Sequence, residues 1–358
     1  MSIKSVKIIG CGLIGTSIGL GLKEFGASIS LEDVSDMNLA LAKDLLGTSE
    51  ASSNSKPEII LIATPPQFIF EVIRDQYLVY PDAIFIEVSG IKSELIVQVE
   101  ELSDVSQRFV SVHPMAGREK SGPQSARSDL FKSRAWIICE TKNSSKRAVE
   151  LAKEIGQILE ASIYELDART HDSVIASISH LPQILSSALG ASLSGTEGKY
   201  LNLAGQGLRD VSRLADSDSE LWTNLLAGNS EQVLPKLAEV INRLSNLQKS
   251  LESGDLQEIR SFMEDGKKGR ELIPGKHGGV NRDYSYVPIV IDDKPGGLAR
   301  IFNECAAIGV NVEDLVMEHS PGQEVGLITL ALSSNDATLL QRHLVEKGWL
   351  AHAPRKNQ

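Results

Sequence analysis

One histidine in this chain has both the chemistry and the position of a general base. His113 directly follows residues 108–112, whose length and apolar composition predict a buried strand, and Pro114 fixes the turn after it. A neutral imidazole with a pKa near its usual value of about 6.5 can accept a proton at physiological pH. In a sheet of parallel strands such a residue lies at the rim of the ligand crevice. We therefore predict that His113 is catalytic, against the alternative of a structural histidine.

Gly10-Cys-Gly-Leu-Ile-Gly15 has the spacing of a dinucleotide-binding turn. It joins an apolar run at 6–9, a predicted strand, to a predicted helix at 13–25. In such a unit the first glycine makes the turn, the second lets a pyrophosphate approach the backbone, and the third allows close packing of helix on strand. The phosphates face the helix N-terminus. The cofactor contacts predicted here are Gly10, Gly12, Leu13, Ile14 and Gly15.

Asp33 indicates which dinucleotide binds. It ends a second predicted strand, 18 residues beyond Gly15, where a carboxylate can accept from both ribose hydroxyls and repels a 2′-phosphate. This position favours NAD over NADP. Thr64 and Pro65 follow the next predicted strand and are expected at the nicotinamide end of the crevice, although ordinary strand-to-helix turns would look the same.

Further along the chain, two arginines could contact an anionic substrate, and one helical histidine needs a hydrogen-bond partner. Arg209 and Arg213 are four residues apart and so share a predicted helix face, and a guanidinium suits a carboxylate better than a lysine does. His180 lies in a helix beside Pro182, which breaks a backbone hydrogen bond. The alternatives are surface arginines and a hydrogen-bonded core histidine.

The elements that would position these residues fall into three predicted domains. Alternating strands and helices predict a doubly wound parallel sheet, a Rossmann NAD-binding domain, over 1–165. A helical substrate and dimerisation domain follows over 166–272, with an apolar face that includes Val174, Ile178 and Leu185. Residues 273–285 are glycine-rich and predict a linker. Residues 286–358 have the order βαββαβ of a ferredoxin-like unit.

Composition limits the kinds of partner. The chain has 358 residues, 42% hydrophobic and 23% charged, with a net charge of -11 and no basic block, which argues against nucleic acid or an anionic membrane. Its three cysteines have no disulfide or zinc-binding spacing, so we expect no metal and a reducing, cytoplasmic location. No stretch looks long enough to span a membrane.

A long amphipathic helix is predicted over 230–251. Leu234, Leu237, Ile241, Leu244 and Leu251 recur every three or four residues, a narrow seam typical of helix pairing. This seam predicts a homodimer, with packing inside one subunit as the alternative.

The stretch His113-Pro-Met-Ala-Gly117-Arg-Glu-Lys-Ser-Gly122 after a Rossmann unit resembles prephenate and arogenate dehydrogenases. The resemblance covers nearly the whole chain. It implies that His113 takes the proton of the substrate ring hydroxyl as hydride leaves for NAD, that Arg213 binds a substrate carboxylate and that Trp222 walls the pocket. It also implies that the helix with His180 lines the active site, that Gln183 replaces a second histidine of many relatives, and that Gly117 contacts substrate.

The chain departs from the family in one stretch. The family's D-x-x-S-x-K pattern reads Glu87-Val-Ser-Gly-Ile-Lys92 here, with Gly90 in place of the active-site serine. Ser89, one residue earlier, is the candidate substitute, although a shift of one residue points its side chain differently.

The last domain resembles a second family. Lys294-Pro-Gly-Gly-Leu-Ala-Arg-Ile-Phe302 and Gly309-Val-Asn-Val312 are similar to ACT domains, which often bind an amino acid. Tyrosine or phenylalanine is the feedback ligand that this resemblance implies. The alternative is a docking module without a ligand.

The activity that the resemblance implies is oxidative decarboxylation of prephenate to 4-hydroxyphenylpyruvate with NAD, in tyrosine biosynthesis. Arogenate is the alternative substrate. A β-hydroxyacid dehydrogenase would need a catalytic lysine where this chain has Ser-His-Leu-Pro. A regulator that only senses NAD or an amino acid would leave His113 and Arg213 without a purpose.

Overall fold

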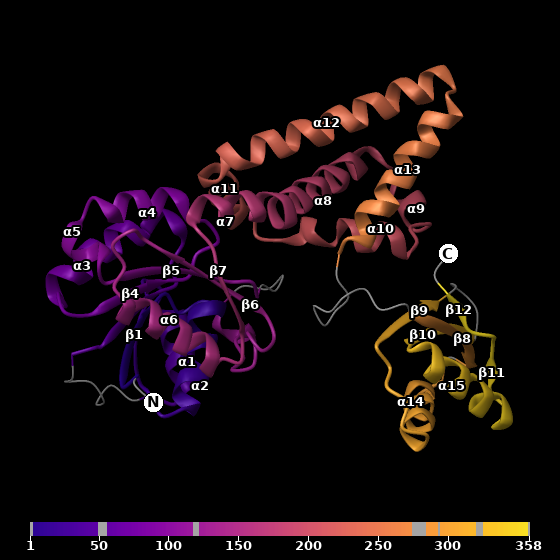
Figure 1. Cartoon of the computed structure of the whole chain (residues 1–358), viewed down its shortest axis with the longest axis horizontal. Coiled ribbons are helices and arrows are strands. Elements are labelled where there is room, and N and C mark those ends of the chain that lie inside the picture. Colours follow the sequence, from indigo (N-terminus) through magenta and orange to yellow (C-terminus); the bar gives the residue numbers. More distant parts are fainter. Residues whose placement is uncertain are drawn as a thin grey trace. The chain divides into compact units, whose positions relative to one another are not determined.

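The computed structural model describes residues 3–48, 56–116, 122–273, 284–292, 294–319 and 325–356. The chain forms two compact units, residues 1–244 and 245–358. Each unit is described by itself (Figure 1).

A seven-stranded sheet forms the base of the first unit, in the order β2-β1-β3-β4-β5-β6-β7. The strands are β1 (Ser5–Ile9), β2 (Ser28–Glu32), β3 (Ile59–Ile62), β4 (Ile84–Glu87), β5 (Phe109–Pro114), β6 (Ala135–Glu140) and β7 (Ser162–Glu165). The predicted parallel sheet is confirmed for β1 to β5, whereas β6 runs antiparallel to β5 and β7 is parallel to β6. A parallel strand needs a crossover, usually a helix, and the described part of the connection from β5 to β6 contains only a 3-10 turn, Pro123–Ser125.

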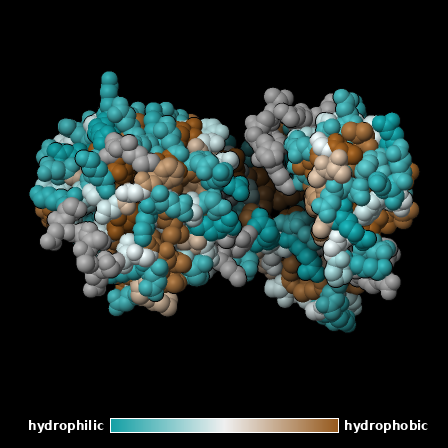
Figure 2. Space-filling view, turned by 90° about the horizontal axis from the view of Figure 1, so that it is seen from below, coloured by the Kyte–Doolittle hydropathy of each residue, from teal (hydrophilic) through white to brown (hydrophobic). Residues whose placement is uncertain are grey.

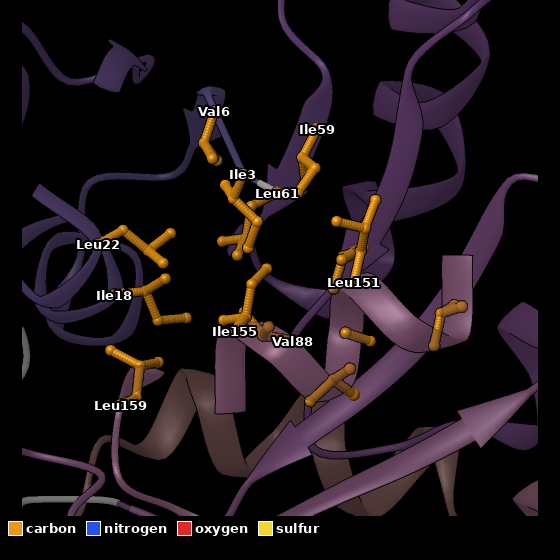
Figure 3. Packing of buried hydrophobic residues seen from close by; sticks show 14 of the residues in the cluster. Ile3, Val6, Ile18, Leu22, Ile59, Leu61, Val88, Leu151, Ile155 and Leu159 are labelled. Carbon is orange, nitrogen blue, oxygen red and sulfur yellow. The ribbon is translucent and has the colours of Figure 1, made fainter. Parts of the chain in front are cut away.

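Helices cover both faces of this sheet. On one face lie α1 (Leu13–Glu24), α2 (Asp36–Leu46) and α6 (Lys146–Ile158), and on the other α3 (Ile69–Val79), α4 (Ser93–Glu100) and α5 (Ser103–Ser106). Figure 3 shows the first layer, in which Leu22 of α1 and Ile155 of α6 point toward Leu61 of β3. Because both faces are covered, every residue of β3 and β4 is buried.

A continuous helix, residues 168–195, leads into the helical part of the unit. It consists of α7 (Ala168–Ile175), a π-helical turn (Ala176–His180), α8 (Leu181–Ser192) and a 3-10 turn (Leu193–Gly195). The π-helical turn comes just before Pro182, which lacks the amide that a regular helix would use. Then follow α9 (Gly198–Leu201), α10 (Gln206–Ser212), a 3-10 turn η5 (Arg213–Asp216), α11 (Ser219–Gly228) and α12 (Ser230–Ser253), whose end belongs to the second unit.

This continuous helix buries polar residues and exposes apolar ones. His171, Asp172, His180, Gln183 and Ser186 are buried, whereas Val174, Ile178 and Leu185 of the predicted apolar face are 38%, 59% and 38% exposed. By length and composition the helix could also cross a membrane, with a mean hydropathy of 1.3 in its most apolar window. The expectation that no stretch is long enough is therefore wrong. A core helix passes the same test, and its buried polar residues belong to the site described below.

In the second unit, α13 (Leu256–Glu271) precedes a small antiparallel sheet of order β11-β8-β10-β9. The predicted order βαββαβ is present in β8 (Ser285–Asp292), α14 (Gly297–Ala307), β9 (Asp314–His319), β10 (Val325–Leu332), α15 (Ser334–Glu346) and β11 (Leu350–Ala351), and β12 (Arg355–Lys356) also pairs with β8. Alternate residues of β8 and β10 form its core with the two helices. Residues 320–323, where Ser-Pro-Gly-Gln predicts the turn of a hairpin, lie outside the described residues.

Hydrophilic residues cover much of the face seen in Figure 2, with hydrophobic residues interspersed among them. This pattern is ordinary for a protein surface, of which more than half is contributed by apolar atoms.

Candidate active site

The glycine turn between β1 and α1 has the geometry of a dinucleotide site. Gly10 has φ +97°, and an added Cβ would lie 2.5 Å from the carbonyl oxygen of Ala63; a Cβ on Gly15 would collide with the carbonyl oxygen of Gly10. Apart from its chain neighbours, no atom of the described residues lies within 4 Å of a Cβ built on Gly12, so packing against them does not explain this glycine. Gly12 is the N-cap of α1 and supplies no side-chain cap. The backbone amides of Leu13 and Ile14, in the first turn, therefore suit a pyrophosphate.

Asp33 lies at the end of β2, beside the glycine turn. Its two carboxylate oxygens accept hydrogen bonds from the backbone amides of Cys11 (2.6 Å) and Ser35 (2.7 Å). Each oxygen keeps a further lone pair, so the fixed carboxylate can still accept from ribose hydroxyls. Burial, with Asp33 second, raises the pKa of the Cys11 thiol to about 12, which keeps this neighbouring cysteine protonated.

Thr64 and Pro65 follow β3 at the same edge of the sheet. The buried hydroxyl of Thr64 has no hydrogen-bond partner among the residues that the structure describes. Buried hydroxyls normally have a partner, so this one is consistent with a ligand contact.

His113, at the end of β5, is the first member of a chain of three side chains. Its Nδ1 lies 2.9 Å from Nε2 of His171, and Nδ1 of His171 lies 2.8 Å from Oδ1 of Asp172. An ionised carboxylate only accepts, so Nδ1 of His171 carries its proton and, in the neutral ring, Nε2 accepts from Nδ1 of His113. The other nitrogen of His113, Nε2, is then unprotonated and can serve as a base.

The charge states that this assignment requires follow from the surroundings. Burial and then the positive charge of Lys92 lower the pKa of His113 well below its usual 6.5. Burial also lowers the pKa of His171, against the opposing effect of Asp172. Burial alone would raise the pKa of Asp172, but hydrogen bonds from His171 and Ser93 outweigh it and lower this pKa. At neutral pH both imidazoles are therefore uncharged and the carboxylate is ionised.

Asp172 also connects α7 to the nucleotide-binding sheet. Its Oδ1 accepts from the amide of Lys92 (3.0 Å) and its Oδ2 from the amide of Ser93 (2.7 Å), at the N-terminus of α4. These are amides that a helix leaves unpaired, and the positive end of the helix dipole favours a carboxylate there.

Glu87 and Lys92 form a buried ion pair. They are the first and last residues of the stretch 87–92, which departs from the family pattern. Lys92 Nζ lies 2.6 Å from Glu87 Oε1, and both side chains are inaccessible to solvent. Lys92 also donates to the carbonyl oxygen of Val112 (2.8 Å), the residue before His113. The hydroxyl of Ser111 and the amide of Ser89 donate to Glu87 as well. The pair thus fixes the end of β5 relative to the end of β4.

Ser89, the candidate substitute for the missing serine, is hydrogen-bonded within its own loop. Its hydroxyl donates to the carbonyl oxygen of Ile91 (2.9 Å), inside the loop. Gly90 faces the ring of His113: a Cβ there would lie 3.8 Å from Nε2 of His113 and 3.1 Å from Leu225. Beside it, Nδ1 of His113 donates to Nε2 of His171.

His180 lies in the π-helical turn and is nearly inaccessible. Its Nδ1 lies 3.1 Å from the amide nitrogen of Asn229, and Trp222 packs edge-on against its ring with centroids 5.8 Å apart. His180 also contributes to the lowered pKa of His113. The structure thus brings His180 and Trp222 together near His113.

Gln183 and Arg213 are linked through the backbone. Nε2 of Gln183 donates to the carbonyl oxygen of Leu214 (2.7 Å), in η5, which begins at Arg213. Arg213 is exposed, and because it starts a 3-10 turn it does not share a regular helix face with Arg209. Gln183 therefore holds the turn that carries Arg213. Gly117 lies outside the described residues, and within those residues no group of three potential metal ligands occurs.

Sequence reasoning missed His171, Asp172 and Asn229. His171 and Asp172 lie four residues before the apolar Ile175 and Ala176 and so on the same buried helix face, a pattern that could have flagged them. Asn229 lies between two helices, where an asparagine usually indicates only a cap.

A dehydrogenase that uses a nicotinamide dinucleotide needs a nucleotide cradle at the strand ends and a base nearby to take the proton of an alcohol. The first unit provides both, which assigns the chain to this class.

Comparison with known proteins gives the family. The family model described as prephenate dehydrogenase, nucleotide-binding domain matches residues 18–165, and the one described as prephenate dehydrogenase, dimerization domain matches residues 167–265. The chain belongs to the prephenate dehydrogenase family. A probable prephenate dehydrogenase of Streptomyces niveus, NovF, is 29% identical over 98% of this chain and 100% of its own length.

Two solved structures share the fold. Prephenate dehydrogenase from Aquifex aeolicus, in complex with hydroxyphenyl propionate and NAD+, has a TM-score of 0.68 at 24% identity and covers 76% of this chain and 99% of its own. Arogenate dehydrogenase from Synechocystis has a TM-score of 0.62 at 24% identity, covering 74% and 98%.

Proposed function

We propose that this protein catalyses the NAD-dependent oxidative decarboxylation of prephenate to 4-hydroxyphenylpyruvate, in tyrosine biosynthesis. Family membership supports the reaction. The observation that carries the proposal is the chain His113–His171–Asp172, which leaves Nε2 of His113 unprotonated beside the nucleotide-binding sheet.

The protein's part in the reaction is to orient the substrate and to move one proton. NAD, when bound, accepts the hydride from the ring carbon that carries the hydroxyl. His113 Nε2 takes the hydroxyl proton, and His171 with Asp172 stabilises the positive charge that develops on His113. Loss of carbon dioxide then makes the ring aromatic. Because aromatisation drives the reaction, alignment and proton transfer are the main tasks left to the protein.

The cofactor contacts in this proposal are the amides at Gly12, Leu13 and Ile14, the Asp33 carboxylate, and the loop at Thr64 and Pro65. Asp33 supports NAD over NADP, since it would repel a 2′-phosphate.

For the substrate, we assign the carboxylate clamp to Arg213 and the pocket wall to Trp222, with His180 as a polar contact and Gln183 as a residue that positions the Arg213 turn. Ser89 is left out because its hydroxyl bonds within its own loop. Gly117 rests on the family resemblance alone.

Arogenate is the second candidate substrate. Oε1 of Gln183 is buried and accepts no hydrogen bond from any described residue. An acceptor atom suits the ammonium group of arogenate better than the keto group of prephenate.

The assay that tests the function uses purified protein, NAD, and either prephenate or arogenate. We expect faster turnover of prephenate, and His113→Asn should lower kcat by about 10² to 10⁴ while NAD still binds. Faster turnover of arogenate would shift the proposal to the second candidate, and a near-normal kcat in His113→Asn would remove the general base.

Arg213→Ala should raise KM for the substrate far more than it lowers kcat, because a carboxylate clamp acts on bound substrate and transition state alike. Arg213→Lys should recover only part of the affinity, since a point charge lacks the fork of the guanidinium. Arg209→Ala is the matched control and should leave KM near normal. If only the Arg209 variant raises KM, the clamp is Arg209.

We also propose a homodimer in the cytoplasm. On the helical part of the first unit, Ile178, Leu234 and Ile241 are more than half exposed in the single chain, as a surface covered by a second copy would be. The description of the matching family model as a dimerization domain supports this assembly. Three free, buried cysteines suit a reducing compartment.

For the last part of the chain we propose an ACT domain that binds tyrosine or phenylalanine. Its βαββαβ order, and Gly296 with φ +83° at the N-terminus of α14, support the resemblance found in the sequence.

A further inference from the structure

Asn229 connects three helical segments through one amide group. It caps the C-terminus of α11, is 3% exposed, and directs its side chain inward. Its Nδ2 lies 2.9 Å from the carbonyl oxygen of Asp172 in α7 and 3.1 Å from Nδ1 of His180 in the π-helical turn.

This geometry fixes the direction of both hydrogen bonds. A backbone carbonyl can only accept, so the atom facing Asp172 is the amide nitrogen, which has two hydrogens. The second hydrogen points to Nδ1 of His180, which must therefore be the unprotonated nitrogen of that ring. Burial lowers the pKa of His180 to about 4, so the ring is neutral at pH 7 and carries its single proton on Nε2.

We propose that Asn229 is a positioning residue that holds His180 as a hydrogen-bond donor through Nε2, for an anionic or keto oxygen of the substrate. The inference rests on the proposed function and extends it. The pocket then contains two neutral imidazoles of opposite polarity, with Nε2 of His113 accepting and Nε2 of His180 donating.

Polarity matters because a neutral histidine can adopt either tautomer. If Nδ1 of His180 carried the proton, Nε2 would present a lone pair to the substrate oxygen, and a hydrogen bond to a charged group would become a repulsive contact. The same amide group also donates to the backbone carbonyl of Asp172, whose carboxylate sets the tautomer of His171. Asn229 therefore contacts both the residue that orients His171 and the ring of His180.

Two substitutions separate this role from simple packing. Asn229→Ala and Asn229→Asp both lose the hydrogen bond to the Asp172 carbonyl, but only the aspartate offers an acceptor that draws a proton onto Nδ1 of His180. We expect KM for prephenate to rise about tenfold in Asn229→Ala and further in Asn229→Asp, with KM for NAD near wild type. Asn229→Gln, which keeps the amide, should recover part of the loss.

The direct readout is the ¹⁵N NMR spectrum of the full-length protein labelled at histidine, with His180 assigned by His180→Gln. In the wild type at pH 7 we expect a protonated Nε2 and an unprotonated Nδ1, and in Asn229→Asp a protonated Nδ1. A wild-type Nδ1 that carries the proton would overturn the proposal even if the variants fail to fold, and so would equal KM increases in Asn229→Ala and Asn229→Asp. Absence of prephenate turnover in the wild type counts against the proposed function and leaves the NMR result standing.

Discussion

At the scale of the residue, partners decide the chemistry of each histidine. His171 makes His113 donate from Nδ1, which leaves Nε2 as a base, whereas the donor on Asn229 leaves His180 with its proton on Nε2. The two side chains are chemically identical, so the different placement of their protons comes from neighbours that lie 58 and 49 residues away in the sequence.

The pH dependence of the rate should show how weak a base His113 is. Its lowered pKa means that the neutral, active form persists below pH 6.5. Log kcat/KM measured from pH 8 downward should therefore stay level through pH 6.5 and fall only at lower pH, as His113 becomes protonated. A fall that begins near 6.5 would show that the ring is more solvated than the structure indicates. His113→Asn should lose this fall along with the rate.

His171 is predicted to act through His113. His171→Phe removes the acceptor for Nδ1 of His113, so the proton is free to move to Nε2 and block the base. We expect kcat to fall by about 10² to 10⁴, as when the wrong histidine tautomer is formed in other enzymes, with little change in KM. His171→Gln keeps an oxygen acceptor and should restore part of kcat. Equal loss in both variants would indicate a packing role only.

Local sequence sets the positions of some residues of the candidate site, and tertiary packing sets the others. The places of His113, Asp33 and the glycines at strand ends and in the turn could be predicted, because the local sequence sets them. The contact between His113 and His171 could not, since it joins residues 58 positions apart and depends on the way α7 packs against β5.

At the scale of the element, the buried pair Glu87–Lys92 holds the ends of β4 and β5 together. Lys92→Met would leave the Glu87 carboxylate buried without its cation, which costs about 3–5 kcal/mol in unfolding free energy. Urea unfolding followed by circular dichroism measures this cost.

The double variant Glu87→Gln, Lys92→Met is the control. It removes both charges, so it should regain much of the lost stability. If Lys92→Met alone unfolds at the wild-type urea concentration, the ion pair has no structural role.

Hydrophobic periodicity predicted strands at 6–9 and 108–112 and helices at 13–25 and 230–251, and β1, β5, α1 and α12 match them to within one or two residues. The exceptions have physical causes. Helix α4 was not predicted. Its first turn is capped by Asp172, a residue 79 positions away, so the local sequence contains no cap signal for it. The antiparallel direction of β6 depends on the course of a connection that has no periodic pattern.

At the scale of the whole molecule, the last domain should make the enzyme responsive to tyrosine. Tyrosine is expected to bind near the turn at Gly296 and near Asn311, and to weaken prephenate binding reciprocally. Isothermal titration of the full chain measures tyrosine binding, and initial rates measure the increase in KM for prephenate.

Deletion of residues 284–358 gives the matched control. The shortened enzyme should remain active and lose sensitivity to tyrosine. Equal inhibition of both forms would mean that tyrosine competes in the active site and that the domain serves assembly.

The carboxylate of Asp172 has a mechanical consequence. It belongs to α7, the first helix after the nucleotide-binding sheet, yet it accepts hydrogen bonds both from the N-terminus of α4 and from the ring of His171. A movement that pulled α7 from α4 would therefore also weaken the support of His113, because His171 depends on the same carboxylate for its tautomer. One carboxylate thus links the packing of two helices to the hydrogen-bonded state of the His113–His171 pair.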